Sequence, residues 1–391
     1  MAFDFLLDSF KITGTTLKEF KKIAKEIDEA TQIIPLNFSH ADVYHLLSVD
    51  KSLIKYSVFS AGNNFNVSNS GALIVGKTAR VKMDYIYQYY PDFFNEIVHE
   101  NKTMLRLSVG DEGKFYFFGE TFYKTFSAQT SCIGGFFLKE CSIERDIALS
   151  KIFTDEMDLN TLVRSNGKIH KIFGVFSDKF CRVPLDNIAQ CITHFNDSEV
   201  KFWEINQKET QIYIEFPKIV SSYDKPSIIP GIRITTSDTG YSQTDIELCF
   251  RNANGKAENY HRIKKTSFKH IKEISINDLI SEIENMINEA IFITEKFMTY
   301  RKSIEDISIK GINAYKRTIN ELLSMGYFKE EMGVKTQKDI VSFLTQNSQL
   351  DVKKSKILDE IIALSDINNT ITAYQKEKFR NVLGNIIKNV A

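Results

Sequence analysis

The sequence predicts an α+β protein with mostly antiparallel sheets in its central region, an N-terminal helical segment and an α-helical C-terminal region. Two observations predict this class. Between about residues 50 and 270, short runs of alternating apolar residues are separated by turn residues, as in antiparallel strands. From Ser275 onward, apolar residues recur every three or four positions and proline is absent, which favours helices. We therefore expect an N-terminal α+β region at 1–165, a central antiparallel β region at 166–273 and an α-helical region at 274–391.

Composition and charge exclude some classes of protein. The chain has 391 residues, enough for about two or three domains with a large buried core. Its 50 Lys and Arg balance its 50 Asp and Glu, which argues against a wholly cationic nucleic-acid coat but permits a local basic patch. No apolar run reaches the roughly 18 residues of a membrane span, and the N-terminus, with Asp4 and Asp8, is unlike a signal peptide. We expect a cytoplasmic protein without a membrane partner.

The cysteines give little sign of a metal site. The chain has 5 Cys, without C-x-x-C spacing, and in a reducing compartment they are expected to be small buried apolar residues. Cys181, Cys191 and His194 could be named as metal ligands. Zinc sites usually show paired short spacings, so core thiols and a surface histidine are the favoured interpretation. No metal site is predicted.

The first 50 residues are predicted to be helical. Thr15 or Thr16 can cap a helix whose apolar residues recur at three and four positions. These apolar residues are Leu17, Phe20, Ile23, Ala24 and Ile27. Ser39 is expected to cap a second, short helix. The apolar residues of that second helix would be Val43, Leu46 and Leu47.

Residues 51–76 are predicted to form a strand, a polar loop and a second strand. Gly71 to Thr78 (GALIVGKT) matches the letter of the phosphate-loop pattern. A phosphate loop must be flexible and open a helix so that its amides face phosphates, whereas the four residues between these glycines are Ala, Leu, Ile and Val. A buried strand that ends in a turn is the favoured interpretation, and no cofactor is predicted.

The next elements alternate between helix and strand. Residues 83–100 are predicted to be helical with a break near Pro91, and their Tyr and Phe side chains are assigned to the core rather than to a stacking surface. Residues 104–126 predict an antiparallel meander around the turn at 110–113. Further helices are expected at about 143–153 and 184–195. Further strands are expected at 171–176, 200–205 and 211–216.

Residues 229–272 contain the strongest local signals. Alternating runs at 232–234 and 246–250 flank a turn at 238–240. A second turn follows at Asn254-Gly255, where both residues tolerate positive φ. The stretch predicts a β-hairpin with a second turn at its end.

The C-terminal region is predicted to consist of helices. Ser275 can cap the first of them, with Asp278 in its first turn. Further helices are expected at about 304–325, 336–347, 352–365 and 370–390. Their apolar stripes are assigned first to internal packing and second to self-association.

Two segments of the chain resemble a known family. Residues 173–187 (FGVFSDKFCRVPLDN) are similar to the family pattern A-x-x-S-D-R-Y-x-x-L-D-N, and residues 230–262 are similar to its N-S-E-x-G, R-x-x-C-x-N-G and H segments. On these residues the chain resembles the phage- and plasmid-like proteins grouped as domain of unknown function 932. It departs from the pattern at Lys179, Phe180, Thr236 and Asp238. The resemblance implies an origin in a phage, prophage or plasmid and supplies no catalytic residues.

A basic run makes nucleic-acid binding the first functional hypothesis, with single-strand DNA handling or annealing as the process. From Arg251 to Lys272, seven Lys and Arg stand against Glu258 alone, the densest positive run in the sequence. Cations would neutralise phosphates, and Tyr260, with Tyr241 or Phe268, would stack on bases. The expected binding residues are Arg251, Lys256, Tyr260, Arg262, Lys264, Lys265, Lys269 and Lys272. A charged edge that discourages strand pairing explains the same run about equally well.

Two other functional classes stay open. One is an interaction protein of a mobile element, a host-defence antagonist or assembly component with a host protein partner and no nucleic-acid ligand. In either hypothesis we expect a homo-oligomer. The other class, an enzyme, is less favoured. Asp238-Thr239-Gly240 matches the aspartic-protease triplet, in which two carboxylates share a proton. The chain has one copy of this triplet, so a second carboxylate could come only from a symmetric dimer. A turn is the favoured interpretation.

Overall fold

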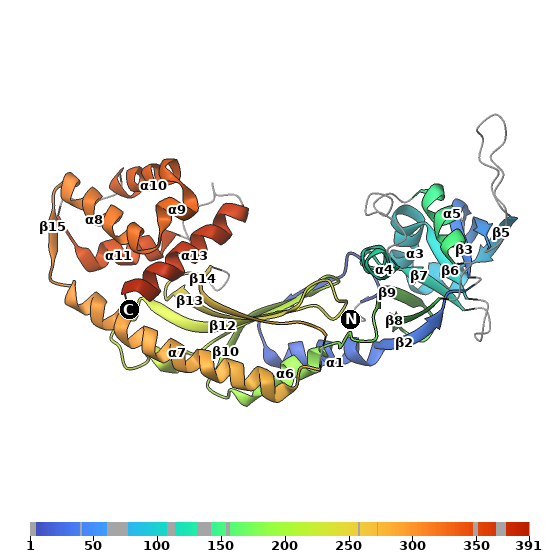
Figure 1. The fold of residues 1–391 in the computed structure, drawn as a ribbon, viewed down its shortest axis with the longest axis horizontal. Coiled ribbons are helices and arrows are strands. Elements are labelled where there is room, and N and C mark those ends of the chain that lie inside the picture. The colour runs from blue at the N-terminus through green and yellow to red at the C-terminus, as the bar shows by residue number, and fades with distance from the viewer. Residues whose placement is uncertain are drawn as a thin grey trace.

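The computed structural model describes most of the chain and confirms the α+β class. The described residues are 5–39, 41–60, 77–107, 114–130, 142–153, 157–256, 259–271, 273–346, 351–364 and 373–390. Figure 1 shows an elongated molecule with an eight-stranded sheet at one end, the C-terminal helices at the other and a six-stranded sheet between them.

The eight-stranded sheet has the order β2-β8-β9-β7-β6-β3-β4-β5, and all its pairs are antiparallel except β7 with β9. Its strands are β2 (Thr31–Asn37), β3 (Asp42–Asp50), β4 (Leu53–Phe59), β5 (Lys77–Lys82), β6 (Thr103–Arg106), β7 (Phe115–Phe118), β8 (Asp158–Ser165) and β9 (His170–Phe176). Strands β2 and β5 are its two edges.

Helices cover both faces of this sheet. They are α2 (Asp84–Tyr89), α3 (Pro91–Glu96), the π-helical turn η1 (Ile97–Asn101), α4 (Phe122–Thr130) and α5 (Ile143–Ile152). Tyr44 and Val58 pack in one core with α2, α3 and η1, whereas their chain neighbours Val43 and Phe59 pack in another with α4 and α5. Alternation along each strand therefore supplies two separate cores.

The six-stranded sheet is antiparallel throughout, in the order β1-β10-β11-β12-β13-β14. Its strands are β1 (Lys11–Gly14), β10 (Glu199–Asn206), β11 (Thr210–Glu215), β12 (Ile228–Thr236), β13 (Thr244–Asn252) and β14 (Tyr260–Phe268), with the 3-10 turn η2 (Pro217–Val220) after β11. One face packs on α1 (Leu17–Ala30), α6 (Leu185–His194) and α7 (Ile276–Ser303), which lie beneath it in Figure 1. Its core includes Trp203, Ile232 and Leu248. The predicted hairpin of β12 and β13 is confirmed.

The predicted C-terminal helices are also confirmed. After α7 come β15 (Ser308–Lys310), α8 (Ile312–Met325), α9 (Phe328–Met332), α10 (Val334–Gln346), β16 (Asp351–Lys353), α11 (Lys354–Ile362) and α13 (Ala373–Val390). Ser275 caps α7: its Oγ accepts a hydrogen bond from Asp278 N at 3.1 Å, and the Asp278 carboxylate accepts one from Ser275 N at 3.0 Å. Helix α13 packs on β14, where a Cβ at position 384 would lie 2.1 Å from the Arg262 carbonyl oxygen. Only glycine permits this approach.

The prediction of a helical first 50 residues is wrong outside α1. Thr16 caps α1 as predicted, because its Oγ1 accepts a hydrogen bond from Glu19 N at 3.3 Å. The second predicted helix, after Ser39, is instead strand β3. A register shift between Leu46 and Ser48 breaks the alternation of β3, so its apolar residues mimic helical spacing.

Two further predictions need correction. The predicted meander ends at β7, because residues 122–130 form α4, with Phe122, Tyr123 and Phe126 buried at helical spacing. Strand β8 was not predicted. The predicted boundary after residue 165 lies in the turn between β8 and β9, which pair in one sheet. The turn at 110–113 and most of the phosphate-loop match at 71–78 lie outside the described residues.

Candidate nucleic-acid interface

The predicted basic run occupies the end of β13, the following turn and β14, the strand against which α13 packs. Arg251, its first cation, is buried. Its Nη2 donates to Glu215 Oε2 at 3.0 Å, and its Nη1 donates to the carbonyls of Asn252, Ala253 and Gly255. Arg251 therefore holds the turn closed rather than facing solvent.

Three more cations of the run are paired with carboxylates. Arg262 Nη1 lies 3.0 Å from Glu247 Oε1, and its Nε donates to Asn381 on α13. The other two pairs are Lys264 with Glu289 on α7 at 3.0 Å and Lys265 with Asp245 on β13 at 2.7 Å. At each position a nearby carboxylate already compensates the charge of the cation.

The remaining predicted residues do not gather on one free face. Tyr260 is 5% exposed, stacks on Tyr213 at 5.5 Å and has its pKa raised to about 12 by burial. Lys256 is exposed and has contacts of its own. Lys269 is exposed and lines a cavity of about 400 Å³ between the two sheets, together with Tyr241. Lys272 lies outside the described residues. The expectation of a free cationic face at this run is not met.

A different surface carries unpaired cations. Lys51 lies in the turn between β3 and β4, Lys55 lies on β4, and Lys77, Arg80 and Lys82 lie on the edge strand β5. All five are exposed. Within the described part of the chain, none of these five side chains has an ion-pair partner. We call these residues the basic β4–β5 surface.

The register of β4 and β5 concentrates this charge. Lys55 lies directly opposite Arg80, so both side chains project from the same face of the sheet, and Lys82 lies on that face two residues further on. Lys77, opposite Val58, projects from the other face. Like charges placed directly opposite destabilise a sheet. Edge protection accounts for charges on β5, but it does not account for Lys55 on the strand inside it.

The sequence contains a signal for this surface that cation density does not show. From Lys51 to Met83 the chain has five Lys and Arg and no Asp or Glu. The number of cations per residue is lower in this segment than in the run at 251–272, so cation density alone does not identify the segment. What distinguishes the segment is that no Asp or Glu lies between the flanking residues Asp50 and Asp84.

A buried ionic cluster joins the two sheets and contains Asp238. Arg164 of β8, 2% exposed, donates to Asp238 Oδ2 at 2.5 Å and to Gln207 Oε1 at 2.6 Å. Arg182 also contacts Asp238, at 3.4 Å, and pairs with Asp28 at the end of α1. Burial by itself raises the pKa of Asp238, but the two arginines outweigh it and hold that pKa below its usual value. The protease interpretation is therefore disfavoured, because this carboxylate is committed to its charged, paired form.

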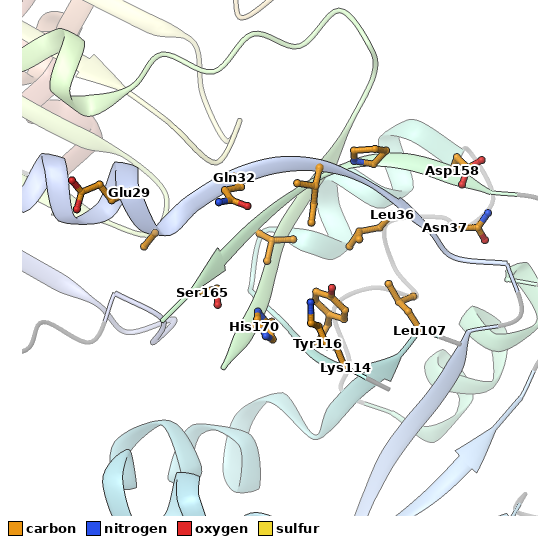
Figure 2. A pocket seen from close by; sticks show the side chains of 14 residues that line it. Glu29, Gln32, Leu36, Asn37, Leu107, Lys114, Tyr116, Asp158, Ser165 and His170 are labelled. Atoms are coloured by element: carbon orange, nitrogen blue, oxygen red, sulfur yellow. The ribbon is translucent and has the colours of Figure 1, made fainter. Parts of the chain in front are cut away.

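A cavity of about 920 Å³ lies between β2 and the strands β7, β8 and β9. Figure 2 shows Leu36 of β2 on one side of it and Tyr116 and His170 on the other. This volume is in the range of small-molecule sites. Its lining includes Lys114 together with Asp158, so its charge favours no single class of ligand.

The structure also bears on the predictions about metal ligands and membrane spans. Cys191 is buried, which raises the pKa of its thiol to about 12, and His194 lies 3.5 Å from Glu284 on α7. The residues that the structure describes include no group of three or more His, Cys, Asp or Glu placed to bind a metal ion. No described helix is both long and apolar enough to cross a membrane.

Comparisons with protein-family models, with curated proteins and with solved structures found no match to this chain. The resemblance to the phage- and plasmid-like family therefore stays a prediction.

Proposed function

We propose that the protein binds nucleic acid through the basic β4–β5 surface. The observation that carries this proposal is the placement of Lys55 opposite Arg80, on one face and without a carboxylate partner in the described part of the chain. Phosphates supply the negative charge that this pair lacks. Binding would release counterions from the nucleic acid, which is the main source of sequence-independent affinity.

This proposal keeps the predicted class of ligand and changes the place where it binds. In the run at 251–272, four cations are paired with Glu215, Glu247, Glu289 and Asp245, whereas no cation of the basic β4–β5 surface has an ion-pair partner among the described residues. The expected homo-oligomer and host protein partner remain predictions, and no surface described above favours either.

A salt titration tests the proposal. We expect the protein to bind an oligothymidylate of about 20 nucleotides at about 50 mM salt. If all five cations contact phosphates, the plot of log affinity against log salt should fall with a slope of about −3.5, from roughly 0.7 per contact on a single strand. Fluorescence anisotropy with a labelled oligonucleotide measures both quantities. Absence of binding at low salt, or a slope near zero, would contradict the proposal.

A further inference from the structure

Helix α2 carries an exposed cluster of tyrosines. Tyr85, Tyr87 and Tyr89 are 43%, 53% and 60% exposed. The Tyr85 ring lies 4.9 Å from that of Tyr89 and 5.7 Å from that of Tyr90, measured between centres. Within the described part of the chain, the hydroxyls of Tyr85, Tyr87 and Tyr89 have no hydrogen-bond partner. Neither core packing nor hydrogen bonding accounts for three such side chains, and exposed aromatic clusters mark interaction sites.

The cluster lies beside the end of the basic β4–β5 surface that carries Lys51 and Lys82, whereas Lys55 and Arg80 project from the face of the sheet opposite to α2. Met83 and Ile86 are buried and hold α2 on the sheet. Met83 N donates to the Ser52 carbonyl at 2.9 Å, which places the start of the helix beside the turn that carries Lys51. Tyr85 follows Lys82 by three residues, so their Cα atoms lie within about 11 Å of each other.

Charges of both signs lie around the cluster, and a lysine lies beside one of its rings. Lys168, an exposed residue of the β8–β9 turn, places its Nζ 5.9 Å from the centre of the Tyr85 ring. Asp84, the one carboxylate on α2, accepts a hydrogen bond from the Ser52 hydroxyl. Cations next to exposed aromatic rings are the combination that proteins use on single strands, where phosphates and base faces are both accessible. A duplex hides its base faces in the stack.

We propose that Tyr85 and Tyr89 stack on unpaired bases, so that the ligand of the basic β4–β5 surface is a single strand. The inference rests on the proposed function and adds the class of nucleic acid. It also corrects the assignment of the aromatic residues at 83–100 to the core. Phe93 and Phe94 are buried and Tyr90 packs against the same core, whereas Tyr85, Tyr87 and Tyr89 are exposed.

Paired substitutions test this inference. In Tyr85→Ala/Tyr89→Ala, affinity for the oligothymidylate should fall roughly tenfold or more, because stacking on at least one base is lost. Binding of a duplex of the same length should change by less than about twofold, because its bases are not available to stack. The matched control, Tyr85→Phe/Tyr89→Phe, keeps the rings and should bind like the wild type. Urea denaturation should be the same for all three proteins, since the side chains are exposed.

The outcomes separate this inference from the proposed function. If the alanine variant binds the single strand as the wild type does, the base-stacking assignment is overturned and a protein partner becomes the occupant of the cluster. Equal weakening for single strand and duplex would also overturn it. If the wild type binds neither nucleic acid, the proposed function fails and this inference fails with it.

Discussion

Replacing Asp238 by Asn should lower the free energy of unfolding by about 3–5 kcal/mol, because Arg164 and Arg182 would keep their charges in a buried site without their shared carboxylate. The cluster ties β8 of one sheet to the turn between β12 and β13 of the other. Urea denaturation followed by the fluorescence of Trp203, the single tryptophan and 1% exposed in the six-stranded core, measures the change.

Asp245→Asn is the matched control. Asp245 is the second residue of the adjoining strand β13 and pairs with Lys265, but its side chain is 15% exposed and its partner is 37% exposed. Its replacement should cost less than about 1 kcal/mol. Equal effects of the two substitutions would show that the buried cluster does not hold the sheets together.

The same carboxylate gives stability a dependence on pH. The pKa of Asp238 is lowered in the folded protein. Its contribution to the free energy of unfolding is therefore complete above the usual pKa of 3.8 and is lost as the pH falls through the pKa of the folded state. The free energy of unfolding of the wild type should therefore decrease more steeply in acid than that of Asp238→Asn.

Replacing Lys55 and Arg80 by Gln should weaken single-strand binding roughly tenfold or more at low salt and reduce the salt slope from about −3.5 to about −2. The variant should also be more stable by a few tenths of a kcal/mol, because two like charges on facing strands are removed. Anisotropy titrations and urea denaturation of one preparation measure both effects.

Lys264→Gln/Lys265→Gln is the control for this variant. Both lysines lie in the predicted basic run, and both are paired with carboxylates. We expect their removal to change affinity by less than about threefold and to lower stability slightly, since two exposed ion pairs are lost. If this control weakens binding and Lys55→Gln/Arg80→Gln does not, nucleic acid binds at β14.

Local signals in the sequence predicted part of the fold correctly. The hairpin of β12 and β13, the Ser275 cap and the break at Pro91 depend on residues close in sequence, and each formed as expected. The predictions for β3 and α4 were wrong for different reasons. A bulge gives β3 helical spacing, and the apolar residues of α4 are dense enough to resemble alternation.

The basic run at 251–272 misled the prediction of the site because the carboxylates that pair with its cations are distant in sequence. Lys264 pairs with a glutamate 25 residues away, and Arg251 pairs with one 36 residues away. Only the fold brings these carboxylates to the cations of the run. The segment from Lys51 to Met83 differs because no acidic residue lies within it and none in the described structure folds onto its cations.

The location of bound nucleic acid is the central claim, and photochemical cross-linking measures it most directly. The wild-type protein would be irradiated with an oligothymidylate containing 5-iodouracil, digested and analysed by mass spectrometry. We predict cross-linked peptides from residues 51–60 and 77–90, on β4, β5 and α2. Cross-links confined to residues 251–272 would contradict the account, because they would place the ligand on the strand whose cations are paired.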